Sequence, residues 1–263
     1  VDLSVKTGNL LHESQKERGI TAVYMSSNGE RFRNEIGEQR RATDERLGEW
    51  QQAVAQSKNE FPESVKDGLD TARVALDELA PRRQQATSLA VKPVEITDYF
   101  TATHARLLAA IGALASASDD AKLRGRSTAY LSFLTAKEKT GSVRASLATA
   151  FGSGTFLPGQ YERIISLISA RDSFLGVFRS FAEKDVLDVF AAKEATPVVA
   201  EVVAMERVAI DKGAAGNFGV DSSVWFKKMT ERINLMKEVE DAQTRAILSD
   251  VDTLRENAQS AER

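Results

Sequence analysis

Three arginines fall on the apolar faces of predicted helices, and buried arginines are suited to binding an anion. Arg144 shares a face with Leu134 and Phe151 at steps of three and four residues, which is the spacing of a buried helical stripe. Arg18 and Arg207 hold similar positions in two other helical stretches. A buried guanidinium needs a carboxylate, backbone carbonyls or a bound anion, because an unpartnered buried charge is strongly unfavourable. Several such arginines around one cavity would form a receptor for a small anion.

Polar residues beside these arginines form a second group of candidates: Gln15, Glu17, Lys137 and Glu138. The two glutamates could hold the arginines in place, and Gln15 could orient Arg18 or donate to the ligand. Lys137 could add positive charge, although a lysine at the edge of a helix is usually solvated. Each arginine also has a simpler interpretation, as an interhelical salt bridge or as a side chain that extends to solvent.

Other kinds of site find little support in the sequence. There is no cysteine, and the two histidines, His12 and His104, lack acidic residues at metal-binding spacing, so we expect no metal site. No nucleophile and base pattern and no phosphate-binding loop is present. Arg40 and Asp44, four residues apart, are interpreted as an ordinary helical ion pair. The sequence therefore predicts neither an enzyme nor a cofactor.

The composition favours a helical protein with a balanced charge. Of 263 residues, 28% are charged and only five are proline, and the net charge is -3. Such a balance gives no general attraction for nucleic acid or anionic lipid, so we expect no nucleic-acid partner. Any preference for an anion must then come from local arginines.

The apolar spacing predicts an all-α fold of about eight helices. They are expected at about 1–25, 31–57, 62–81 or kinked to 89, 94–117, 118–151, 157–181, 185–212 with a bend at Pro197, and 221–263. Residues 137–141 echo residues 16–19, and residues 172–178 echo residues 44–50. Two echoes in the same order indicate a duplication, and hence two related up-down four-helix bundles. We expect a single sensor domain over 1–263, with halves at about 1–117 and 118–263 that could share long helices.

Three segments carry a resemblance to a known family. They are residues 13–19 with 39–44, residues 136–145 with 150–154, and residues 224–233 with 239–240. In this order and spacing they resemble the NIT family, the nitrate- and nitrite-sensing domains of bacterial receptors and regulators. The resemblance implies paired four-helix bundles, a homodimer, and a small anion, nitrate or nitrite, as ligand. The positions that match the family's sensing arginines are Arg18, Arg144 and Arg207.

On this basis we expect the ligand-binding domain of a bacterial transmembrane receptor, of the chemoreceptor or sensor-kinase type. Both ends of the sequence look helical, so the first and last helices would continue into membrane spans and the domain would be periplasmic or extracellular. Two alternatives stay open. One is a helical interaction module without a ligand, and the other is a sensor of a different small carboxylate or amino acid.

Overall fold

The computed structural model describes residues 1–57 and 59–261, and the chain divides into two compact units. Unit 1 comprises Val1–Arg124 and unit 2 comprises Gly125–Arg263. Across the described ranges there are ten α-helices and one short 3₁₀ helix, with no strand. The all-α prediction is therefore confirmed. The last predicted helix was expected to reach residue 263, but residues 262–263 lie outside the described residues.

Unit 1 holds four helical rods, the third of which consists of two helices. Its helices are α1 (Asp2–Ser26), α2 (Glu35–Ser57), α3 (Glu63–Asp77), α4 (Leu79–Thr87) and α5 (Pro93–Ser116). The turn after α1 uses Asn28 and Gly29, both with positive φ, as the Asn-Gly pair predicts. Within the unit, α1 packs against α2 and α5, and α5 packs against α3.

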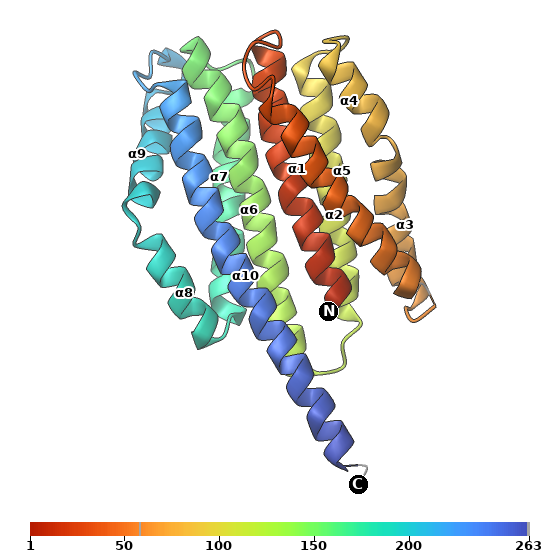
Figure 1. Cartoon of the computed structure of the whole chain (residues 1–263). Helices are drawn as coiled ribbons and strands as arrows, with labels where there is room; N and C mark the ends of the chain where they lie inside the picture. Colours follow the sequence, from red (N-terminus) through yellow and green to blue (C-terminus); the bar gives the residue numbers. More distant parts are fainter. Residues whose placement is uncertain (58, 262–263) are drawn as a thin grey trace. The chain divides into compact units, whose positions relative to one another are not determined.

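Unit 2 repeats this plan with a longer first helix and a longer last helix. It contains α6 (Ala121–Ser153), α7 (Gln160–Phe181), α8 (Lys184–Glu194), α9 (Pro197–Lys212), the 3₁₀ helix η1 (Gly213–Ala215) and α10 (Ser222–Ala261). The backbone amide of Leu123 donates to the Asp120 carboxylate at the start of α6, so Asp120 caps this helix. The 40-residue α10 continues past the other helices of its unit (Figure 1).

The third rod of each unit is broken near a proline, which raises the helix count from eight to ten. Pro81 lies in the first turn of α4 and Pro197 is the first residue of α9. A proline has no N–H to donate and its ring crowds the preceding turn, so the helix is interrupted just before it. Figure 1 shows α8 and α9 as two segments that meet at an angle. The predicted bend at Pro197 and the kinked alternative at Pro81 are both confirmed.

Each unit buries two stacked apolar clusters, one for each half of its broken rod. In unit 1, Trp50 and Leu69 of α3 belong to one cluster, and Leu79 of α4 and Phe100 belong to the other. Unit 2 has the same arrangement, with Phe190 of α8 in one cluster and the α9 valines with Trp225 in the other. The matching order of rods, breaks and clusters is what a duplicated bundle would produce.

The stripe predicted on α6 is buried along most of its length. Its members are Leu123, Ser127, Tyr130, Leu134, Lys137, Gly141, Arg144, Ala148 and Phe151; all are buried except Ser127 and Ala148, which are partly buried. A second stripe, which includes Phe133, Val143 and Leu147, is buried in the core of unit 2. The helix α6 is therefore buried on more than the one face that was predicted.

Candidate functional site

Arg18 is buried in unit 1, as predicted. Its side chain is only 2% exposed, and its Nη1 donates a hydrogen bond of 3.1 Å to the hydroxyl oxygen of Thr101 on α5. The contact joins the first helix of the unit to its last. The hydroxyl positions the guanidinium through this bond.

Arg144 is held in the same way in unit 2. It is 5% exposed, and its Nη1 donates over 3.1 Å to the hydroxyl oxygen of Thr230 on α10. That hydroxyl donates its own hydrogen to the backbone carbonyl of Phe226, so its oxygen is directed to accept from the arginine. The guanidinium also lies 4.8 Å from the centre of the Phe226 ring, a favourable cation–π distance.

The two arginine–threonine contacts are equivalent features of the duplicated bundles. In each unit an arginine of the first rod donates to a threonine of the last rod, at the same distance. Neither Thr101 nor Thr230 was predicted as a site residue. Thr230 lies inside one of the segments that carry the family resemblance, which was the available signal.

Two polar residues flank Arg18 on α1, one turn to each side. Gln15 is 5% exposed and Thr21 is 2% exposed. Among the described residues neither the amide of Gln15 nor the hydroxyl of Thr21 has a hydrogen-bond partner. Buried polar atoms are nearly always satisfied, so a pair of unsatisfied groups beside a buried arginine requires an explanation. Gln15 was predicted as a candidate, and Thr21 was not.

Arg207 is the exception among the three predicted arginines, because it is exposed. On α9 the buried residues are valines, Glu206 and Ala209. Glu206 therefore occupies the inward position and the next residue along the helix faces solvent. The prediction that Arg207 lies on a buried seam is wrong.

The predicted carboxylate Glu17 has a different role from the one expected. It is fully buried and accepts two hydrogen bonds from Arg83 of α4, at 2.7 and 2.9 Å. Arg83 also donates to Asp44 at 2.6 Å, so the predicted Arg40–Asp44 pair is replaced by an interhelical one. Burial alone lowers the pKa of Arg83, but these two carboxylates raise it overall. Arg40 instead donates to Thr87 and to the Arg83 carbonyl.

Lys137 is buried and not solvated, which corrects the simpler interpretation of this residue. It is 1% exposed and its ammonium lies 3.0 Å from Glu240 of α10. Burial lowers the pKa of Lys137, and Glu240 opposes that effect. Lys237 contacts the same carboxylate and also Asp241. The remaining candidate, Glu138, is buried on α6.

A buried ion-pair cluster in unit 2 was missed by the sequence analysis. Arg171 of α7 donates to both carboxylate oxygens of Glu206, at 2.9 and 2.6 Å, and Arg232 of α10 lies 3.7 Å from the same carboxylate. All three are less than 5% exposed. Burial and the neighbouring Arg171 lower the pKa of Arg232. The position of Arg232 between Met229 and Met236 is the helical spacing that could have revealed it.

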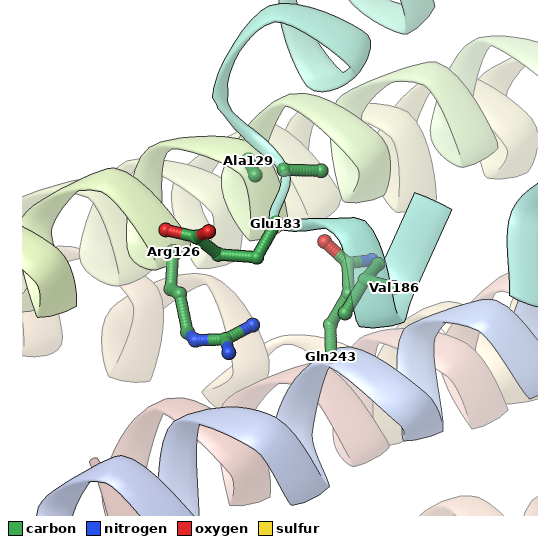
Figure 2. Close-up of a pocket in the computed structure, with 6 residues that line it drawn as sticks. Arg126, Ala129, Glu183, Val186 and Gln243 are labelled. Carbon is green, nitrogen blue, oxygen red and sulfur yellow. The ribbon is translucent and has the colours of Figure 1, made fainter. Parts of the chain in front are cut away.

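A small cavity lies between α6, the turn before α8, and α10 (Figure 2). It encloses about 10 Å³ and is lined by Arg126, Ala129, Ala182, Glu183, Val186 and Gln243. The buried amide of Gln243 has no hydrogen-bond partner among the described residues, while Arg126 is bound by Asp185 and Asp250. This space suits a single water molecule that bonds to the amide.

Comparison with known proteins places this geometry in a family. The model of the family described as nitrate and nitrite sensing, NIT, matches residues 9–248. The nitrate regulatory protein of Klebsiella oxytoca is 25% identical over 247 residues, which are 94% of this chain and 62% of that protein. The solved structure of the NasR transcription antiterminator has a TM-score of 0.91 at 23% identity, and the match covers 99% of this chain and 70% of that one. The fold is therefore shared with the antiterminator.

The same comparisons correct the predicted location. The similar proteins are a nitrate regulatory protein and a transcription antiterminator, not membrane receptors, so the periplasmic or extracellular placement is contradicted. Within residues 1–57 and 59–261, no helix combines the length and the apolar character needed to cross a membrane. The expectation of no nucleic-acid partner gains no support from these relatives. The resemblance noted in the sequence is confirmed over most of its length, and the chain belongs to the NIT family of nitrate- and nitrite-sensing domains.

Proposed function

We propose that this chain is the sensing domain of a non-enzymatic regulatory protein and that it binds nitrate or nitrite through its buried arginines. Nitrate and nitrite are small planar anions, and a guanidinium offers a rigid fork of donors that can meet two oxygens at once. The proposal assigns ligand binding to Arg18 and Arg144. Arg207 stays a predicted ligand residue, which its exposed position does not favour.

The observation that carries this proposal is the repeated arginine–threonine contact. In both units the guanidinium is positioned by a neutral hydroxyl. Gln15, with an unsatisfied buried amide one turn from Arg18, supplies a further donor for an oxyanion. The repeated contact and the unsatisfied amide support an anion site at these arginines.

The contacts also suggest how binding is transmitted. Arg18 links α1 to α5, and Arg144 links α6 to α10. An anion that draws the guanidinium away from its threonine would shift one helix against the other by about 1–2 Å. Such a shift requires that the anion bind the two helix arrangements with different affinity. Because α10 extends beyond the rest of unit 2 (Figure 1), its movement would be carried out of the bundle.

A thermal-shift screen tests this function directly. The chain would be melted with nitrate, nitrite, chloride, sulfate, formate and amino acids. An anion at 100 times its dissociation constant adds about 2.7 kcal/mol to the free energy of unfolding, so we expect a clear rise in melting temperature with nitrate or nitrite. A response only to amino acids or other carboxylates would favour a different sensor, and no response to any compound would favour a ligand-free interaction module.

A further inference from the structure

The first turn of α10 is fastened to the end of α6 by two hydrogen bonds to backbone carbonyls. The indole Nε1 of Trp225 donates to the carbonyl of Arg144 at 2.9 Å, and the hydroxyl of Ser222 donates to the carbonyl of Ala148 at 2.6 Å. The two acceptors lie one turn apart on α6. The bonds therefore fix the position of α10 along α6 as well as its distance from that helix.

The loop before α10 adds a third bond at the same end. The backbone amide of Asn217 donates to the carbonyl of Gly154, directly after α6, at 2.7 Å. Gly216 has a φ of 62°, and a Cβ at this position would lie 2.5 Å from the same carbonyl oxygen, so the approach requires glycine. The ring of Phe218 packs edge to face on that of Phe151. The α10 clasp, meaning this loop contact and the two bonds to α6, therefore fixes the start of the helix.

The far end of the α6–α10 pair is joined by an ion pair. Arg126 of α6 donates to Asp250 of α10 at 2.6 Å and to Asp185 of α8 at 3.0 and 3.2 Å. The small cavity lined by Arg126 and Gln243 also lies at this end (Figure 2). An arginine can keep such contacts by changing its side-chain torsions while a helix moves. A backbone carbonyl has no such freedom, because it is fixed in its own helix.

The proposed anion site lies next to the α10 clasp. Arg144 accepts from Trp225 through its carbonyl and donates to Thr230 through its guanidinium. Measured from Trp225 along α10, Thr230 is about 7.5 Å away and Ser249 about 36 Å away, at 1.5 Å per residue. A turn of α10 about the clasp that moves Thr230 by about 1 Å would therefore move Ser249 by about 5 Å.

We propose that anion binding turns α10 about the α10 clasp, so that its start stays on α6 while its far end swings against the Arg126 ion pair. A piston movement of α10 along its own axis would instead break every bond of the clasp. The inference rests on the proposed function, in which Arg144 binds the anion, and it adds the direction of the resulting movement. The clasp can be tested without an anion, so the two proposals can fail separately.

Pairs of spin labels measure the two ends of unit 2, since the chain has no cysteine of its own. Cysteines at the exposed residues Thr149 and Ser223 report on the clasp, and cysteines at the exposed residues Ser180 and Ser249 report on the far end. Calorimetry records nitrate binding to each labelled chain. With nitrate bound, we expect the far pair to change its distance by several ångström and the clasp pair to keep its distance. Equal changes in both pairs, as in a piston, or no change in either would overturn the proposal.

Matched glycine variants test the clasp without any anion. Gly216 and Gly219 both have positive φ, so alanine is strained at either position, but only at Gly216 would its Cβ meet a backbone atom. We expect Gly216→Ala to broaden the distance distribution of the clasp pair and Gly219→Ala to leave it as in the wild type. An unchanged clasp pair in Gly216→Ala, or equal broadening in the two variants, would overturn the proposal.

A variant of the ion pair tests the far end in the same way. Asp250→Asn removes the charge that faces Arg126, so we expect it to broaden the far pair and not the clasp pair. Circular dichroism confirms folding, and Ser222→Ala, which removes one clasp bond, replaces Gly216→Ala if that variant does not fold. Broadening of the clasp pair by Asp250→Asn would overturn the proposal. Failure of nitrate to bind, with these variants behaving as expected, would overturn the proposed function alone.

Discussion

The inward-facing arginines of this protein include two groups that differ in their contacts. Arg83 and Arg171 bind carboxylates through short, two-point contacts, whereas Arg18 and Arg144 donate to threonine hydroxyls. A carboxylate pairs with a guanidinium through charge, while a hydroxyl positions one through a neutral hydrogen bond. The first group would hold the bundles together and the second would bind the anion.

Removing a threonine hydroxyl tests the second group. In Thr230→Val, Arg144 loses the acceptor that positions it, so we expect nitrate affinity to fall and stability to drop by about 1–3 kcal/mol. Thr230→Ser keeps the hydroxyl and should retain most of both. Calorimetric titration and urea unfolding would measure the two effects. Equal nitrate affinity in the valine and serine variants would show that Thr230 does not position the site.

The first group predicts a loss of stability that is separate from ligand binding. Glu206→Gln leaves Arg171 and Arg232 buried without their shared carboxylate, so the free energy of unfolding should fall by about 3–5 kcal/mol. Glu201→Gln on the same helix breaks only an exposed pair with Lys228 and should cost at most about 1 kcal/mol. Urea unfolding would compare them, and similar losses would contradict a structural role for the buried cluster.

Sequence patterns predicted the inward position of Arg18 and Arg144 because each lies in a regular apolar stripe. They did not predict the partners of these arginines, since Thr101 and Thr230 meet them only after helices distant in sequence have packed. The prediction that Arg207 is buried was wrong for a related reason. The α9 pattern allows either of two adjacent positions to face inward, and packing against Arg171 selected Glu206.

Among the helices, the breaks in the two third rods are the feature that could be predicted most directly from the sequence. Proline fixes where each break falls, but the groups that stabilise it come from other helices. In unit 1 the hydroxyl of Tyr99 on α5 donates over 2.7 Å to the carbonyl of Ala75, close to the end of α3. This bond supplies a partner at the point where the helix is interrupted.

The Tyr99 contact predicts a pH dependence. Burial, and to a lesser extent nearby Glu78, raise the pKa of Tyr99 from 10.0 to about 12. Between these values the folded chain retains a proton that the unfolded chain has lost, so stability falls as pH rises from about 10 towards 12. We expect Tyr99→Phe to lose this part of the dependence in urea unfolding measured across that range. An unchanged pH profile would contradict the assignment.

At the scale of the whole chain, duplication explains why one architecture carries two different surfaces. The units share their rods, their breaks and their arginine–threonine contacts, but where α2 exposes Glu38, Arg41 and Glu45, α7 exposes serines at the corresponding positions. The all-α fold and the family could be predicted from sequence because helical spacing and short motifs are local. The location could not, because the resemblance covers receptors and regulators alike and the relatives found here are regulators.

The central claim is that buried arginines bind nitrate or nitrite, and calorimetric titration of arginine variants tests it most directly. We expect nitrate to bind the wild-type chain and to bind Arg18→Ala and Arg144→Ala at least tenfold more weakly, a loss of about 1.4 kcal/mol in binding free energy. The control Arg73→Ala should bind nitrate normally, because Arg73 is exposed on α3 and paired with Asp70 and Asp77. Arg18→Lys and Arg144→Lys serve as second variants that keep the charge if either alanine variant fails to fold. Wild-type affinity for nitrate in folded variants of both arginines would contradict the account.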